Sequence, residues 1–363
     1  MRITYVVPRY LPHLGGIENH VHAIATRMVS FGHDVTVATQ LEDDRALPGV
    51  ERVPDGPLIR RFPSGVKLRG QGLSPSLWRW LRDGADGAEL VHVHNYHALT
   101  TVGVLRTAPR PIVFTPHYLG VGEGTAEAAL HAVHRPMMRG LLRRVRAVIC
   151  VTPSEAAGFV ADLGFASRCH VIPNGVDVAR VERAVPQPVE GRLLVVAGRL
   201  EEYKQPQAAL AALPLLPADY RLALVGAGPM EAQLRASAAE LGVAERVLMP
   251  GKVGPDDVYG WFRAAEAVIT LSRRECFGMT VAEGLAAGAA VVASDIGAHR
   301  DVVAAAGDPR AGLVGVHSTP EEVATAILRV TAESRRSTKA QVSTWAEVAG
   351  KTESLYRSAM SSS

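Results

Sequence analysis

Two carboxylates, Glu275 and Glu283, lie eight positions apart on either side of Gly278. The apolar residues 267–271 before them predict a buried strand, and a short helical segment follows. A strand, a glycine-containing loop and a helix start present backbone N–H groups and a positive helix end to an anion. In an open α/β sheet such a loop lies outside the carboxyl ends of the strands, where ligands bind. Because carboxylates accept hydrogen bonds from hydroxyls, the stretch 273–288 is interpreted as a site for a phosphorylated, hydroxyl-rich ligand, with a nucleotide sugar as the first candidate.

A simpler interpretation of the same stretch is a capping box. Thr280-Val-Ala-Glu283 fits the S/T-x-x-E pattern, in which the glutamate only satisfies a free N–H at the helix start. The two interpretations are compatible, since a carboxylate has two oxygens. We expect Glu283 to order the helix start and to offer its other oxygen to a ligand.

Histidines form a second group of reactive side chains. His92, His94 and His97 lie on or just after the apolar segment 90–94, and a His-x-His pair on one strand face can bind zinc. No third ligand follows at the spacing of a zinc site, so we expect no metal centre. His117 directly follows the predicted strand 111–115 and is placed to contact a substrate; the alternative is a histidine that only caps the strand end.

Closely spaced glycines occur in two further loops. Gly15 and Gly16 precede a predicted helix, where a ligand can approach the backbone, although such glycines are common for turn reasons alone. Gly226-x-Gly228 is followed by Glu231 where a dinucleotide fingerprint has its third glycine, so it is not that fingerprint.

These residues depend on two successive runs of β/α alternation. The first run predicts strands at 3–7, 35–39, 90–94, 111–115, 147–152 and 169–172, with helices at 17–30, 131–145 and 153–163. The second predicts strands at 193–197, 221–225, 247–249, 265–271 and 289–294, with helices at 207–215, 230–241, 321–333 and 343–360. Segment 43–80 is expected to be strand and loop material, and 178–191 a linker. The fold class is therefore α/β, with two Rossmann-like, doubly wound domains facing across a cleft, which is the default ligand site.

Composition excludes several function classes. The 363 residues are 47% hydrophobic and 21% charged, as in soluble globular proteins, and suit two domains. A net charge of +3 is too small for a nucleic-acid-binding face, so no nucleic-acid partner is expected. The arginine-rich segment 131–145 is interpreted as a solvated helix face, with an anionic lipid surface as the alternative.

Cysteine usage and the N-terminal sequence bear on the compartment. Cys150, Cys169 and Cys276 are odd in number and widely spaced, which favours a reducing compartment. The apolar run at the N-terminus is too short for the hydrophobic region of a signal peptide. No apolar run in the sequence reaches the ~20 residues of a membrane span. We expect a cytoplasmic protein, with peripheral contact to the inner face of the membrane left open.

Five motifs in order resemble one known family. They are Gly-Gly-Ile-Glu-Asn-His-Val at 15–21, Pro-Asn-Gly-Val-Asp at 173–177, Gly-Arg-Leu followed by lysine at 198–204, Val-Gly-Ala-Gly-Pro at 225–229, and Glu-Cys-Phe-Gly-Met-Thr-Val-Ala-Glu-Gly-Leu-Ala-Ala-Gly at 275–288. Over essentially its whole length the chain resembles the retaining GT-B glycosyltransferases of family 4 (glycosyl transferases group 1). The resemblance implies an N-terminal acceptor domain of residues 1–178, completed by a C-terminal helix at about 346–363 that crosses back to it, and a C-terminal donor domain of residues 179–345.

The resemblance implies a nucleotide-sugar site in the C-terminal domain. Arg199 and Lys204 would hold the donor diphosphate, Glu275 would bind hydroxyls of the donor sugar, and Glu283 would bind the ribose. The remaining donor-binding positions would be Gly198, Lys252, Val253, Phe277, Gly278, Met279 and Thr280. Positive charge at Arg199 and Lys204 would stabilise the departing nucleoside diphosphate, which is the largest catalytic contribution expected here.

The resemblance also assigns residues of the N-terminal domain. Gly16 would approach the donor diphosphate, and His117 would lie near the donor sugar as a fourth catalytic residue beside Arg199, Lys204 and Glu275. The acceptor side would be formed by Gly15, Glu18, His20, His117 and Tyr118.

The implied activity is transfer of a hexosyl or N-acetylhexosaminyl group to an acceptor hydroxyl with retention of configuration. A UDP-sugar is favoured as donor over GDP-mannose, and a soluble sugar or natural-product acceptor over a lipid. No metal or cofactor other than the nucleotide-sugar substrate is expected. The alternatives are a GT-B nucleotide-sugar epimerase or hydrolase, and a non-catalytic scaffold protein. The chain departs from the family pattern at Ala290, where a proline is common, and at 297–301, where the family often has Gly-Gly-x-Pro-Glu.

Overall fold

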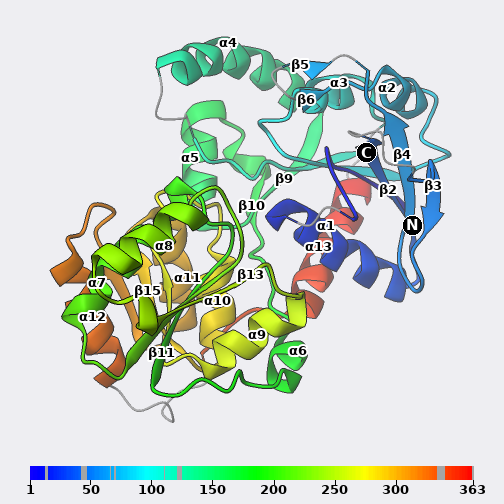
Figure 1. Ribbon diagram of the computed structural model, residues 1–363. Coiled ribbons are helices and arrows are strands. Elements are labelled where there is room, and N and C mark those ends of the chain that lie inside the picture. Colours follow the sequence, from blue (N-terminus) through cyan, green and yellow to red (C-terminus); the bar gives the residue numbers. More distant parts are fainter. Residues whose placement is uncertain are drawn as a thin grey trace. The chain divides into compact units, whose positions relative to one another are not determined.

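The computed structural model describes residues 1–12, 15–41, 47–65, 67–68, 71–109, 111–120, 125–332 and 340–361. The chain forms two compact units, Met1–Gly175 with Trp345–Ser363, and Val176–Thr344. Each unit has its own sheet of mainly parallel strands (Figure 1). The expected α/β fold with two Rossmann-like domains is confirmed, and the C-terminal helix α13 (Trp345–Ser361) returns to the first unit.

The first unit is built on an eight-stranded sheet in the order β10-β9-β8-β7-β1-β2-β4-β3. Its strands are β1 (Arg2–Val6), β2 (Asp34–Leu41), β3 (Val50–Arg52), β4 (Leu58–Pro63), β7 (Leu90–His94), β8 (Ile112–Thr115), β9 (Val145–Cys150) and β10 (Cys169–Val171). All neighbours are parallel except the edge pair β3 and β4. The direction of winding reverses between β1 and β7, which is the position where such sheets bind ligands.

Helices cover both faces of this sheet. α1 (Gly16–Ser30) packs on α13 and β2, and α13 also packs on β9. α2 (Pro75–Arg82), α3 (Leu99–Thr107), α4 (Thr125–Leu142) and α5 (Pro153–Leu163) form the other layer. Because side chains alternate along a strand, Val91 and Val93 of β7 enter the core with α2–α5, while His92 and His94 face the α1 and α13 side. A two-stranded ribbon, β5 (Lys67–Leu68) and β6 (Gln71–Gly72), lies outside the main sheet.

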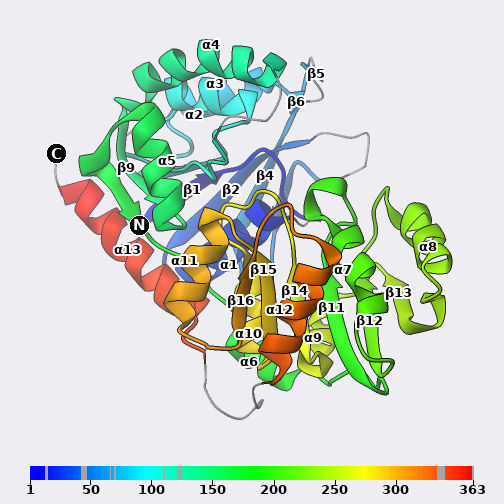
Figure 2. The same cartoon turned by 90° about the vertical axis from the view of Figure 1, so that its left-hand side faces the viewer.

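The second unit has a six-stranded, fully parallel sheet in the order β13-β12-β11-β14-β15-β16 (Figure 2). Its strands are β11 (Arg192–Ala197), β12 (Tyr220–Val225), β13 (Val247–Gly251), β14 (Ala267–Thr270), β15 (Ala290–Ser294) and β16 (Ala311–Val314). Counted from β11, this is the 3-2-1-4-5-6 order of dinucleotide-binding folds. Its switch point lies between β11 and β14.

The helices of the second unit form two layers. α7 (Pro206–Ala212), α8 (Glu231–Glu240) and α12 (Pro320–Ala332) share one apolar core with the sheet. α9 (Pro255–Ala264), α10 (Met279–Ala286) and α11 (Gly297–Ala306) cover the opposite face. A short helix, α6 (Val178–Arg183), packs on α9.

Several elements were not expected from sequence. Helices α2, α3, α9 and α11 and strand β16 were not predicted, and the expected linker 178–191 contains α6, whose start is capped by the Asp177 carboxylate. The predicted helix 131–145 is too long at its end, because Val145 already begins β9 and is buried in the sheet. Among the described residues, no helix has the length and apolar character needed to cross a membrane.

Candidate active site

Two loops of the second unit meet at the switch point between β11 and β14. The β11 loop ends in a 3-10 turn, Glu202–Lys204, and the β14 loop carries Glu275. Lys204 Nζ donates to the Glu275 carboxylate, and both side chains are 22% exposed. The backbone N–H of Arg273 donates to Tyr203 O at 2.8 Å, so the two loops are also joined through the main chain. Two of the residues predicted to bind a donor therefore form an ion pair that solvent reaches.

Three cationic side chains contact Tyr203, beside the Lys204–Glu275 pair. The sequence did not indicate this arrangement. Arg199 Nη2 donates to the Tyr203 hydroxyl at 3.2 Å, while Lys204 Nζ and the Arg274 guanidinium lie over its ring, 5.4 and 5.5 Å from the centroid. Cations over a tyrosine face are attracted by the ring quadrupole. Arg199 also pairs with Glu201 at 2.6 Å and is 70% exposed. The arrangement therefore groups three cationic side chains around one ring, two of them already paired with the carboxylates of Glu201 and Glu275.

The Gly226-x-Gly228 loop after β12 supports the β11 loop rather than forming a phosphate fingerprint. A Cβ at Gly226 would lie 1.9 Å from Gly198 O, and one at Gly228 would lie 2.4 Å from Leu200 O. Leu200 N–H donates to Ala227 O at 3.0 Å. The glycines therefore let two backbones touch, and this contact fixes the loop that carries Arg199.

Gly278 begins α10 and shows that the predicted capping box is wrong. Gly278 is the N-cap, with φ +102°, and no side chain caps the helix. Thr280 lies inside the first turn, so it cannot act as the N-cap residue of the S/T-x-x-E pattern. Within the described chain, no hydrogen bond is seen from the backbone N–H of Gly278 or Thr280. The start of α10 is thus an uncapped, positively polarised helix end beside Glu275.

Glu283 projects from α10 toward α9 instead of toward its own helix start. Its Oε1 accepts a hydrogen bond from the Tyr259 hydroxyl at 3.1 Å. Burial of the carboxyl away from water raises the pKa of Glu283 to about 7, and the Tyr259 hydroxyl and the Arg180 charge oppose this shift. Lys252 and Val253 follow β13 and lead into α9, but among the described residues neither makes a hydrogen bond or ion pair with Glu283.

His299 of α11 packs against Gly278 in the loop that follows β14. It is fully buried; its Nδ1 is bonded to Ser294 O at 3.0 Å, and its Nε2 has no partner within the described part of the chain. A Cβ at Gly278 would lie 2.7 Å from His299 Cδ2. Burial lowers the pKa of His299, and the nearby Lys204 charge adds to this while Glu275 opposes it. His299 was noted from sequence only as a departure from the family pattern.

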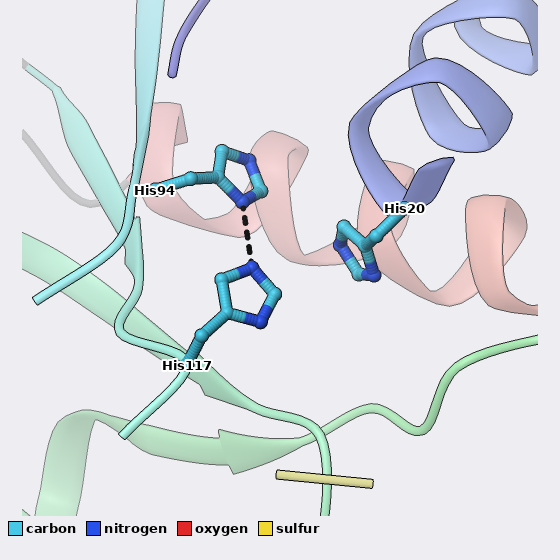
Figure 3. A group of neighbouring side chains, drawn as sticks. All are labelled: His20, His94 and His117. Atoms are coloured by element: carbon cyan, nitrogen blue, oxygen red, sulfur yellow. Dashed lines mark hydrogen bonds between the residues drawn. The ribbon is translucent and has the colours of Figure 1, made fainter. Parts of the chain in front are cut away.

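The first unit holds a separate group of predicted residues at its own switch point. His20 of α1, His94 at the end of β7 and His117 after β8 converge (Figure 3). His94 Nδ1 and His117 Nε2 are 3.3 Å apart, and His20 Nδ1 is bonded to Asn174 Oδ1 at 2.8 Å. Burial lowers the pKa of His20 to about 4 and lowers those of His94 and His117 well below the ordinary value, so all three rings are neutral at pH 7. His117 has φ +46°, a conformation rare for a residue with a side chain.

The other residues predicted for the acceptor side of the first unit do not all lie near this histidine cluster. The Glu18 carboxylate folds back over Gly15, where a Cβ would be 2.5 Å from its oxygen, while the space beside Gly16 is open. Tyr118 is not part of the cluster of His20, His94 and His117. Its ring is buried in the core with α4 and α5, and its hydroxyl donates to Asp162 at 2.6 Å.

The histidines considered as metal ligands from sequence do not act together. Both ring nitrogens of His92 are bonded, to Tyr356 at 2.5 Å and to Thr115 at 2.8 Å, and His97 is exposed. The sequence offered no third ligand at zinc-site spacing, but the fold brings His20 of α1 and His117 after β8 beside His94.

Comparisons with known proteins identify the family. The model "Glycosyltransferase Family 4" matches residues 14–180 and "Glycosyl transferases group 1" matches residues 179–344. The phosphatidyl-myo-inositol mannosyltransferase of Mycolicibacterium smegmatis is 31% identical over 319 residues, 84% of this chain and 78% of the relative. The D-inositol 3-phosphate glycosyltransferase of Acidothermus cellulolyticus is 29% identical over 366 residues, covering 87% and 78%.

Solved structures agree in fold. Sucrose-phosphate synthase from Thermosynechococcus elongatus superposes with a TM-score of 0.81 at 20% identity, over 100% of both chains. HepE from Anabaena, in complex with UDP and glucose, gives a TM-score of 0.76 at 19% identity, over 99% of this chain and 100% of that one. With both halves matched by family models and the two-sheet architecture in place, the chain belongs to the family 4 glycosyltransferases and is an enzyme of the GT-B fold.

Proposed function

We propose that the chain transfers a hexosyl or N-acetylhexosaminyl group from a nucleoside-diphosphate sugar to an acceptor hydroxyl, with retention of anomeric configuration. The observation that carries this proposal is the solvent-accessible Lys204–Glu275 pair at the switch point of the second unit, beside the uncapped start of α10. A cation, a carboxylate and the positive end of a helix suit a ligand that carries both phosphates and hydroxyls.

In this proposal the bound ligand replaces Lys204 and Glu275 as each other's partner. Without ligand, the Lys204 ammonium and the Glu275 carboxylate neutralise each other. A diphosphate competes for the ammonium and for Arg199, while sugar hydroxyls donate to the Glu275 oxygens that are released. Thr280 and the backbone of 277–279 meet the phosphate and sugar, Glu283 accepts from the ribose, and backbone at 252–253 meets the base.

The same cations serve the chemical step. The bond from the anomeric carbon to the diphosphate oxygen breaks with its electron pair leaving on the diphosphate. The acceptor oxygen bonds the anomeric carbon, and its proton passes to the departing diphosphate. Arg199 and Lys204 stabilise the charge that develops on the leaving group, and such preorganised charge is worth about 10²–10³ in rate for a single group.

The relatives suggest which ligands to test first. HepE was crystallised with UDP and glucose, which supports a UDP-sugar, and the mannosyltransferase supports mannose as the next sugar. Two relatives are named for inositol-containing acceptors, one a lipid and one a soluble phosphate. We propose a soluble cyclitol or sugar hydroxyl as acceptor ahead of a lipid, with Glu18, His20 and His117 of the first unit on the acceptor side.

A two-stage assay tests the proposal. A thermal-shift screen with UDP-, GDP-, ADP- and dTDP-sugars should show stabilisation by one nucleotide class, because a ligand that binds only the folded state raises the melting temperature. That donor is then incubated with soluble cyclitols, sugars and phosphatidylinositol vesicles, and the product anomer is assigned by NMR. An inverted product would refute retention. Donor consumption without any acceptor product would favour a hydrolase or epimerase.

A further inference from the structure

Three histidines of the first unit converge at the switch point between β1 and β7. His20, His94 and His117 come from three different elements and are 4%, 1% and 8% exposed. One ring nitrogen of each lies within 4.8 Å of those of the other two. Figure 3 shows the three rings facing a common space.

The spacing fits the ligand set of a small transition-metal ion. Tetrahedral zinc with Zn–N bonds of about 2.0–2.1 Å places neighbouring ligand nitrogens about 3.3 Å apart. His94 Nδ1 and His117 Nε2 are already 3.3 Å apart. The His20 nitrogen lies within 4.8 Å of the other two, so it would have to move closer by up to about 1.5 Å to reach the same separation.

The surroundings orient the rings as metal ligands. Asn174 Oδ1 accepts from Nδ1 of His20, which leaves Nε2 of that ring as the nitrogen with a free lone pair. Such a second contact, on the ring nitrogen away from the ion, is the usual support of a metal-binding histidine. His94 Nδ1 faces His117 and is the ligand atom of its ring, while its Nε2, on the side away from the ion, has no hydrogen-bond partner among the residues described.

Imidazole binds metal ions through a ring nitrogen that carries no proton. A ligand set of three histidines leaves the fourth tetrahedral position for water or another small ligand.

We propose that His20, His94 and His117 form a three-histidine binding site for a divalent transition-metal ion of the zinc class. Binding does not depend on the transferase proposal. One consequence does rest on it: since His20 and His117 are assigned to the acceptor side, an ion held there should inhibit transfer.

The test uses the full chain, freed of metal with a chelator and titrated with Zn²⁺ by calorimetry and with Co²⁺ by visible absorption. We expect one ion per chain and the intense d–d absorption of tetrahedral Co²⁺. His94→Asn should weaken zinc binding by more than the 10–100-fold that loss of an outer-sphere partner costs. His97→Ala, which removes an exposed histidine near the same strand end, is the matched control and should bind normally.

Several outcomes would overturn the site. They are no zinc binding by the wild type, an octahedral Co²⁺ spectrum, or equal zinc affinity in the wild type and His94→Asn, which would indicate adventitious binding elsewhere. His117→Asn is a second variant in case His94→Asn does not fold, as judged from its thermal unfolding without metal. If zinc binds as expected but leaves transfer unchanged, the metal site stands and the assignment of His20 and His117 to the acceptor fails.

Discussion

Gly278→Ala should destabilise the second unit for two separable reasons. Gly278 has φ +102°, and a side chain in a left-handed conformation costs about 1–2 kcal/mol. The added Cβ would lie 2.7 Å from Cδ2 of the buried His299, and overpacking of this kind costs a further 1–3 kcal/mol, roughly. The expected loss in the free energy of unfolding is therefore about 2–5 kcal/mol.

Gly288→Ala is the matched control at the other end of α10. Gly288 also has positive φ, +80°, but no atom lies within 4 Å of a Cβ placed there. Both substitutions reduce the entropy of the unfolded chain equally, so that effect cancels between them. Gly288→Ala should cost only the conformational energy, about 1–2 kcal/mol.

Thermal and denaturant unfolding of the wild type and both variants measures the difference. A unit of this size loses about 2–4 °C of melting temperature per kcal/mol. Adding His299→Ala to Gly278→Ala should recover the steric part, which a double-mutant cycle isolates. Equal destabilisation by Gly278→Ala and Gly288→Ala, with no coupling to His299, would refute the claim that Gly278 is packed against that ring.

Three further predictions concern single contacts. Glu283 must be ionised to accept from two ribose hydroxyls, and burial raises its pKa to about 7. Donor affinity should therefore fall about tenfold from pH 8 to pH 6. Glu283→Gln should abolish this pH dependence of the affinity, as measured by calorimetry with an intact nucleotide sugar. Tyr203→Phe removes only the hydroxyl that accepts from Arg199 and should raise the donor KM severalfold with little change in melting temperature. Glu155→Gln should lower the unfolding free energy by about 1–3 kcal/mol, because the two carboxylate oxygens accept from the backbone N–H groups of Tyr118 and Val151, both at 2.6 Å, and an amide has only one acceptor oxygen.

The sign of the Glu283 effect on stability is opposite to its effect on binding. Its folded-state pKa is raised above the ordinary value, so its contribution to stability is fully present at low pH and is lost as pH rises toward 7. Donor binding instead strengthens over the same range, since the ionised carboxylate is the acceptor. Wild-type melting temperature and donor affinity should therefore move in opposite directions between pH 6 and 8 if Glu283 dominates both, and a parallel change would contradict this assignment.

The sequence predicted the alternation of strands and helices because parallel strands buried on both faces are nearly continuous apolar runs, as at 193–197 and 221–225. Helix α9 was missed because its sequence, Pro-Asp-Asp-Val-Tyr-Gly-Trp-Phe-Arg-Ala, has a glycine inside it and few strong helix formers. Its stability comes from packing on β11 and α10.

The site could be predicted only as far as local sequence determines it. Glu275 and Lys204 were chosen from motif order, and the fold places them in an ion pair. The role of Tyr203 could not be foreseen, because its contact with Arg274 arises where two loops distant in sequence meet. The capping-box prediction failed because the left-handed conformation of the glycine starts α10 before the threonine that the pattern requires.

The kcat/KM for transfer by Glu275→Gln is the measurement that bears most directly on the donor site. Arg235→Ala, which breaks an exposed ion pair on α8 of the same unit, is the control and should transfer at the wild-type rate. We expect Glu275→Gln to lose about 100-fold or more in kcat/KM, as for removal of one preorganised catalytic group, while its thermal unfolding stays close to that of the wild type. Wild-type kcat/KM in Glu275→Gln would contradict the claim that the donor sugar binds at the switch point of the second unit.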